Sequence, residues 1–232
     1  MKGHQITRLT LHSPKVTETL RFAVISDLHN GDFEDVLPQC AQCDAILVPG
    51  DLVNRHRQGR DNTRAFLQQA PKLAPTFVSL GNHELKCDEP EQVLLELRES
   101  AATLLDNQAV PFKGIWLGGL SSAAGKKPDT SVVEALEKQE GFRLLLCHHP
   151  EYFSKHVAGH AIDLTVAGHA HGGQIVLGKQ GLFAPGQGWF PKWTSGFYFD
   201  KRLLVSRGMT NSAGAPRWHD PCEMLLLTLA PE

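Results

Sequence analysis

The feature that most constrains this chain is a repeated order of short apolar runs, each ending in a cluster of polar residues. The last of these runs, Ile162–Ala167, is followed by Gly168-His169-Ala170-His171-Gly172. A tight turn between glycines can aim two imidazoles at one point, which is a geometry for metal ions. A lone His-x-His also occurs as two surface or strand histidines, so the interpretation depends on the other clusters.

Four further clusters stand upstream, each at the end of an apolar stretch: Asp27-Leu28-His29, Gly50-Asp51, Gly81-Asn82-His83-Glu84 and His148-His149-Pro150. The preceding runs predict buried strands over 20–26, 45–48, 75–80 and 142–146. In an open α/β sheet, functional residues collect where the strands leave the sheet at their carboxyl ends. The five clusters are therefore expected to converge.

The segments between the strands predict helices over 33–43, 61–73, 90–105 and 132–139. This alternation is typical of a sheet wound with helices, and beyond Ile115 the chain becomes richer in strands. Near the start, alternating residues and the turn Ser13-Pro14-Lys15 predict a hairpin at the sheet edge. Strands are also expected over 163–167, 174–177, 201–206 and 223–229, and residues 178–196 are expected to form a loop.

Composition narrows the classes of protein. The 232 residues, 41% hydrophobic and 21% charged, fit one soluble domain spanning 1–232. A net charge of -2 gives no basis for a nucleic-acid surface. No apolar run is long enough to span a membrane and no signal peptide is recognisable, so we expect a cytoplasmic protein, with loose membrane contact left open.

The five cysteines do not form a disulfide pattern. Cys40 and Cys43 have C-x-x-C spacing but fall in a predicted helix, with no second pair to complete a zinc site. Cys147 is expected to be a small core residue.

The clustered side chains suit divalent cations. Carboxylate and amide oxygens mixed with imidazole nitrogens favour ions such as manganese, iron or zinc. Two ions about 3.5–4 Å apart can polarise a phosphoryl oxygen and activate water, but they need a shared anionic ligand. Asp51, on its Gly-Asp turn, can bridge them.

In order and content, these five clusters resemble the motifs of the calcineurin-like metallophosphoesterases: Asp27-x-His29, Gly50-Asp51-x-x-Asn54, Gly81-Asn82-His83-Glu84, His148 and Gly168-His169-x-His171. The resemblance implies a four-layer α/β/β/α sandwich of two mixed sheets. Gly172-Gly173-Gln174 and the tail around Ser206-Arg207-Gly208 further resemble a bacterial branch of small phosphodiesterases, which includes membrane-tethered members and members that cleave lipid-sugar nucleotides.

Carried over by position, the family pattern implies a first ion on Asp27, His29 and His171. Asp51 would bridge, and the second ion would bind Asn82, His148 and His169. Manganese is expected first, with iron, zinc, cobalt or nickel as alternatives. His83 would face the scissile group outside the metal shell, oriented by Glu84, which stands where many members have Asp.

The resemblance implies a hydrolase that cleaves a phosphodiester or pyrophosphate bond of a small-molecule substrate by in-line attack of metal-bound hydroxide. Two alternatives remain: a phosphomonoesterase acting through the same site, and a non-catalytic metal-binding scaffold. The second is disfavoured because every expected ligand position is filled.

Some assignments stay open. His149 competes with His148 as a ligand, and Asn54 is either a support for the Asp51 loop or a local cap. Arg207 and Arg217 are candidates for binding substrate phosphate, against ordinary surface charge. The segment 178–193 carries Trp189 among other aromatic residues, which either bind substrate or a membrane or anchor the loop.

Overall fold

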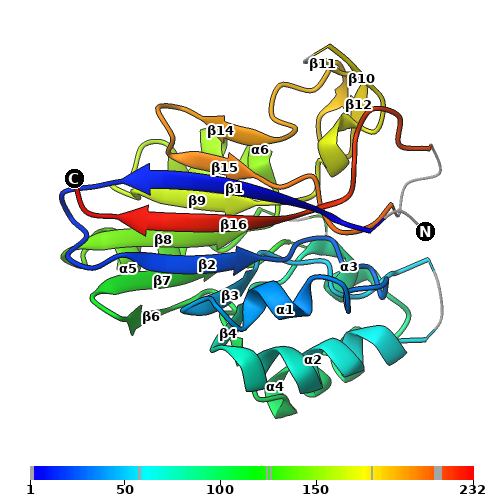
Figure 1. The fold of residues 1–232 in the computed structure, drawn as a ribbon, viewed down its shortest axis with the longest axis horizontal. Coiled ribbons are helices and arrows are strands. Elements are labelled where there is room, and N and C mark those ends of the chain that lie inside the picture. The colour runs from blue at the N-terminus through cyan, green and yellow to red at the C-terminus, as the bar shows by residue number, and fades with distance from the viewer. Residues whose placement is uncertain (1–2, 57–58, 124, 126, 179, 212–215) are drawn as a thin grey trace.

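Two mixed sheets pack face to face in the computed structural model of this chain, and helices cover their outer faces (Figure 1). The structure describes residues 3–56, 59–123, 125, 127–178, 180–211 and 216–232. Within these residues, each of the two large sheets has six strands. The arrangement is the expected α/β/β/α sandwich.

The first sheet is built mainly from the start of the chain. In spatial order its strands are β1 (Gln5–His12), β16 (Glu223–Ala230), β2 (Leu20–Val24), β3 (Ala45–Val48), β4 (Thr76–Val78) and β5 (Thr103–Leu104). β16 runs parallel to β1 and antiparallel to β2, and the strands from β2 to β5 are parallel. The last strand therefore lies between the first two.

The second sheet comes from the rest of the chain. In spatial order its strands are β14 (Gly196–Tyr198), β15 (Leu203–Val205), β9 (Leu164–Ala167), β8 (Phe142–Cys147), β7 (Ile115–Leu120) and β6 (Gln108–Phe112). The strands from β15 to β7 are parallel, and the two edge strands are antiparallel to their neighbours.

The helices are α1 (Leu37–Cys40), α2 (Asp61–Leu73), α3 (Asn82–Lys86), α4 (Pro90–Glu99), α5 (Ser131–Glu137), α6 (Pro150–Tyr152), the π-helical turn η1 (Phe153–Val157) and the 3-10 turn η2 (His171–Gly173). Two small hairpins follow η2: β10 (Val176–Leu177) with β11 (Gln180–Gly181), and β12 (Phe183–Ala184) with β13 (Gly188–Trp189). None of the described helices is long and apolar enough to cross a membrane.

Both faces of each sheet are buried, which explains the nearly continuous apolar strands. Along β2, Phe22 belongs to the core between the sheets, whereas Ala23 belongs to the core beneath α2 and α4. Successive side chains on a strand point to opposite faces, so a strand covered on both sides needs apolar residues throughout. Val132 and Phe153 pack with the outer face of the second sheet in the same way.

Several sequence predictions were confirmed and others were wrong. The strand 45–48 and the helix 61–73 lie where they were predicted. The predicted hairpin is wrong, because β16 separates β1 from β2. The helix over 33–43 is reduced to α1, and the helix from Pro90 ends at Glu99 because Ser100 is extended (ψ 166°), after which β5 begins.

Candidate metal centre

The polar clusters meet at the carboxyl ends of strands from both sheets. Asp27 and Asp51 follow β2 and β3, and Asn82 begins α3 directly after β4. His148 follows β8, and the pair His169 and His171 follows β9. All seven expected ligands, these six and His29, are buried.

Asp51 occupies the middle of the cluster. Its Oδ2 lies 3.0 Å from His148 Nε2, 3.8 Å from His83 Nε2 and 3.9 Å from His29 Nε2. Its Oδ1 accepts a hydrogen bond of 2.8 Å from the backbone N–H of His83. One carboxylate oxygen thus faces His29 of the first expected ligand group and His148 of the second, which is a suitable position for a bridging ligand.

Asp27 forms the second focus. Its Oδ1 lies 3.5 Å from His171 Nε2 and 3.7 Å from His29 Nε2. Ser26 donates a hydrogen bond of 2.5 Å to Oδ2, and the backbone N–H of His169 lies 3.1 Å from both oxygens. Oδ1 also lies 3.9 Å from His148 Nε2, so the carboxylate is fixed by the hydrogen bonds to Oδ2 and from His169 while Oδ1 faces three histidines.

The donor set fits divalent cations. Asp27, His29 and His171 form one compact group, and Asp51, His148 and His169 form another, each with ligand atoms within 4.8 Å of one another. Among the described residues, the buried Oδ1 of Asn82 has no hydrogen-bond partner. Buried polar atoms normally have partners, so an orphaned amide oxygen beside imidazoles and carboxylates is consistent with a cation ligand.

The backbone at the centre adopts an uncommon conformation. Five of the seven expected ligands have positive φ: Asp27, His29, Asp51, His169 and His171. Residues other than glycine seldom adopt this left-handed backbone conformation, and such backbone strain tends to concentrate at functional sites.

Glu84 holds the Asp51 loop in place. Its carboxylate accepts hydrogen bonds from the backbone N–H groups of Asp51, Leu52, Val53 and Gly81 at 2.6–3.2 Å. The fully buried Glu84 therefore acts on the bridging residue, and no described hydrogen bond joins it to the His83 ring. Gly81 permits the close approach, since a Cβ there would stand 2.1 Å from Asp51 Oδ1.

His83 is oriented by the backbone of the same loop. Its Nδ1 accepts a hydrogen bond of 3.1 Å from the N–H of Arg55. Burial lowers the pKa of His83 to about 3, so its ring is neutral at pH 7. With Nδ1 accepting, the proton of the neutral ring resides on Nε2, the nitrogen that faces Asp51 Oδ2.

The two aspartates are ionised. Burial alone would raise the pKa of Asp27 and of Asp51, but the facing imidazoles, with His148 prominent for both, hold each pKa well below its usual value. Burial lowers the pKa of His171 to about 4, which leaves that ring neutral. Burial alone would also lower the pKa of His148, but the facing carboxylates of Asp51 and Asp27 raise it to about 9. A cation here must therefore displace a proton, because metal binds anionic carboxylates and neutral imidazoles.

Comparison with known proteins agrees with this geometry. The family model of the calcineurin-like phosphoesterases matches residues 20–173. The chain belongs to this family.

Two curated relatives illustrate the range of this phosphoesterase family. An uncharacterised metallophosphoesterase of Helicobacter pylori (strain J99) is 28% identical over 74% of this chain and 50% of its own length. The phosphodiesterase YaeI of Escherichia coli is 29% identical over 74% of this chain and 65% of its own. Among solved structures, TT1561 of Thermus thermophilus gives a TM-score of 0.47 at 14% identity, over 65% of this chain and 81% of that one. The chain spans about half the length of the first of these relatives.

The two arginines expected to bind substrate are engaged in contacts with other residues of the chain. The Arg217 side chain is only 7% exposed, and its guanidinium donates to the carbonyls of Arg207 and Thr210 at 2.6 and 2.7 Å. Arg207 pairs with Glu223 at 2.8 Å and Asp220 at 3.3 Å. These contacts favour a role in holding the tail against His171 over a role in binding phosphate.

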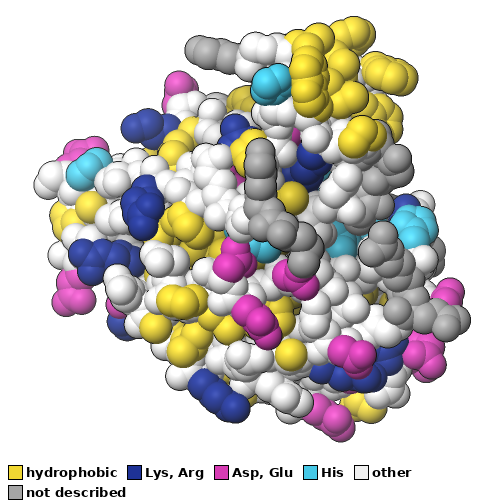
Figure 2. All heavy atoms as spheres, turned by 45° about the vertical axis from the view of Figure 1, so that its right-hand side comes forward, with side chains coloured by type: hydrophobic (Ala, Val, Ile, Leu, Met, Phe, Trp, Pro, Cys, Tyr) yellow, Lys and Arg dark blue, Asp and Glu magenta, His cyan; other side chains and the backbone are white. Residues whose placement is uncertain are grey.

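The two hairpins that carry the aromatic residues lie beside the candidate centre and face solvent. Trp189 is 73% exposed and Phe190 is 67% exposed, whereas Trp193 packs against the outer core of the second sheet. Figure 2 shows hydrophobic side chains gathered at this end of the molecule. Trp193 therefore anchors its part of the predicted loop to the core, whereas Trp189 is exposed enough to contact a ligand.

Other open alternatives can now be compared with the structure. Asn54 accepts from the N–H of His56 at 2.9 Å, which is a local turn contact. His148 faces Asp51, whereas His149 pairs with Glu151 at 3.2 Å. The cysteines are free thiols.

Sequence reasoning overlooked Thr210, which donates to the Asp27 carbonyl at 3.0 Å, and no motif marks it.

Proposed function

We propose that this phosphoesterase is a binuclear metal-dependent hydrolase that cleaves a phosphodiester or pyrophosphate bond in a small-molecule substrate. The first ion would be held by Asp27, His29 and His171, and the second by Asn82, His148 and His169, with Asp51 between them. The carrying observation is that Asp51 Oδ2 faces histidines from three separate loops, within 3.0–3.9 Å.

Two divalent ions bound there would supply Lewis-acid activation of a phosphoryl oxygen and of water. The protein would hold both ions without much rearrangement. Ser26, Glu84 and Thr210 already fix the carboxylates and loops by hydrogen bonds. Oxygen and nitrogen donors of this kind suit manganese, with iron, zinc, cobalt and nickel as alternatives.

His83 would act on the substrate through Nε2. This nitrogen carries the proton of the neutral ring and faces the cluster, so it can donate to a phosphoryl oxygen or to the leaving alkoxide. A neutral donor suits a group whose negative charge grows during the reaction.

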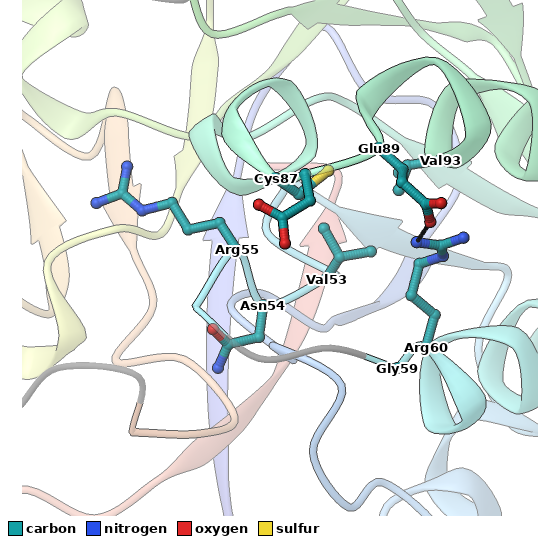
Figure 3. Close-up of a pocket in the computed structure, with 9 residues that line it drawn as sticks. Val53, Asn54, Arg55, Gly59, Arg60, Cys87, Glu89 and Val93 are labelled. Carbon is teal, nitrogen blue, oxygen red and sulfur yellow. Dashed lines mark hydrogen bonds and ion pairs between the residues drawn. The ribbon is translucent and has the colours of Figure 1, made fainter.

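Arg55 is better placed than Arg207 or Arg217 to bind substrate phosphate. Its Nε donates to His56 at 3.0 Å, and among the described residues no ion pair reaches its guanidinium. In Figure 3 its side chain extends away from the other residues that line a cavity of about 350 Å³, among them the ion pair of Arg60 and Glu89. A guanidinium without a carboxylate partner can bind two phosphate oxygens at once.

Access to the centre comes from a second cavity. It measures about 360 Å³ and is lined by His29, Asn54, Thr210 and neighbouring residues. The name of the YaeI relative and the exposed Trp189 support a diester with an apolar or aromatic portion.

The test is the initial rate on bis-p-nitrophenyl phosphate beside p-nitrophenyl phosphate, with metal-stripped protein reloaded with manganese. We expect faster diester hydrolysis that disappears in Asp51→Asn. A higher rate on the monoester would instead support the phosphatase alternative. No rate on either, despite bound metal, would refute hydrolysis of such esters and favour the scaffold.

A further inference from the structure

A third group of metal-ligating side chains lies beside the centre and shares one residue with it. It consists of His149, Glu151 and His169, whose ligand atoms lie within 4.8 Å of one another. His149 Nδ1 is 3.2 Å from Glu151 Oε1, and the His149 and His169 rings have centroids 4.1 Å apart. Two of these residues come from the chain after β8, and the third comes from the turn after β9.

Glu151 is an unusual residue for this position. Its side chain is buried, and its Oε2 has no hydrogen-bond partner among the described residues. A buried carboxylate oxygen without a partner is costly, because it has lost water and gained nothing in exchange. A cation at this point would satisfy it.

Gly186, in the turn between β12 and β13, packs directly against Glu151 and His169. A Cβ at this residue would stand 2.2 Å from Glu151 Oε1 and 3.0 Å from His169 Nε2. The backbone here has φ +73°, a conformation that favours glycine. The chain therefore places no side chain in the gap between the carboxylate and the imidazole.

We propose that His149, Glu151 and His169 form a third cation site, weaker than the binuclear centre, that takes zinc. Two imidazoles and one carboxylate are a known zinc ligand set, with a fourth position left for water. Ligands at about 2.0–2.1 Å around a tetrahedral ion lie about 3.3 Å apart, close to the 3.2 Å between His149 and Glu151.

This site makes zinc an inhibitor as well as an activator. His169 belongs both to this group and to the group with Asp51 and His148. An ion bound at the third site lies beside the second ion and shares His169 with it, so excess zinc lowers the activity of the centre without removing an ion from it. This consequence rests on the proposed function, whereas the existence of the third site does not.

The decisive measurement is zinc stoichiometry by equilibrium dialysis and mass spectrometry, on the full chain stripped of metal and titrated with zinc. We expect about one ion fewer per chain in Glu151→Gln than in the wild type at saturation. Glu137→Gln is the matched control, because Glu137 also pairs with a histidine, His160 at 2.8 Å, away from the centre. It should bind as many ions as the wild type.

His149→Gln gives a second route to the same result, should Glu151→Gln fail to fold. Equal zinc counts in the wild type and a folded variant at either position would overturn the third site. Zinc-dependent diester hydrolysis provides the second readout. The wild-type rate should rise and then fall about tenfold in excess zinc, and Glu151→Gln should remove most of the fall.

Equal inhibition in the wild type and Glu151→Gln would refute the link through His169. If the chain hydrolyses no phosphoester, the zinc counts still decide whether the third site exists. Failure of the proposed function and failure of this inference are therefore separable.

Discussion

The candidate metal centre and the aromatic hairpins are neighbours in the chain but differ in how far their side chains are buried and held in place. At the centre, Asp27 and Asp51 are fully buried, and backbone groups from several loops fix their positions. On the hairpins, Trp189 and Phe190 expose most of their surface. The difference supports the proposal that the chain fixes its reactive groups in advance and leaves Trp189 and Phe190 open to a ligand.

Asp51→Asn should have the largest effect, because it removes the charge that faces three histidines. An amide at this position cannot compensate two cations, and a loss of several kcal/mol of transition-state stabilisation corresponds to a fall of about 10³-fold in kcat. Metal content measured on the same sample should fall as well. A variant that retains both ions and its rate would remove Asp51 from the centre.

His83→Ala should separate chemistry from metal binding. We expect kcat to fall by about 10²- to 10⁴-fold while the metal content stays at the wild-type value. His56→Ala is a suitable control, because His56 is an exposed histidine whose ring lies 5.6 Å from that of His83. A near wild-type kcat in His83→Ala would exclude the proton-donor role.

Glu84→Gln tests how far the backbone fixes the centre. The amide can accept fewer of the four N–H hydrogen bonds, so we expect the free energy of unfolding to fall by about 2 kcal/mol and metal affinity by about 10- to 100-fold. Chemical denaturation and metal titration measure the two effects. Unchanged metal affinity would show that the Asp51 loop keeps its shape without this carboxylate.

Removal of the metal should destabilise the whole fold, because both sheets supply ligands. Manganese at about 100 times its dissociation constant should raise the free energy of unfolding by about 2.7 kcal/mol. The melting temperature should therefore rise with manganese concentration in the wild type and far less in Asp51→Asn. A melting temperature independent of metal would contradict a site shared between the sheets.

Trp189→Ala should have the smallest effect on stability, within about 0.5 kcal/mol, because the side chain is exposed. Its effect should appear as a higher KM for diesters with an apolar or aromatic portion, and little change should occur for small diesters. Leu95→Ala, at an exposed apolar residue on α4, is the control. The same KM for every diester would leave Trp189 without a ligand role.

Much of the fold could be predicted from sequence because local signals were strong. The apolar run Ala45–Val48 and the helix Asp61–Leu73 occur at the predicted bounds. The convergence of the polar clusters followed from one rule, that strands of an α/β sheet present their carboxyl ends together. The resemblance to the family then gave the assignment of the seven expected ligands to two ions.

The rest depends on contacts that no local pattern records. The hairpin prediction failed because the partner of β1 is more than 200 residues away in the sequence. Charge alone could not distinguish Arg55 from Arg207, since the difference lies in the carboxylates that face Arg207. The positive φ of Asp27 and Asp51 is likewise imposed by the surrounding loops.

The position of β16 has a consequence for the order of folding. β2 and β3 lead into the Asp27 and Asp51 loops, yet β2 lacks its other neighbour until residues 223–230 have been synthesised. β1 likewise pairs only with β16 in the described sheet. During synthesis on the ribosome, the edge of β2 that later pairs with β16 therefore stays unpaired until residues 223–230 emerge.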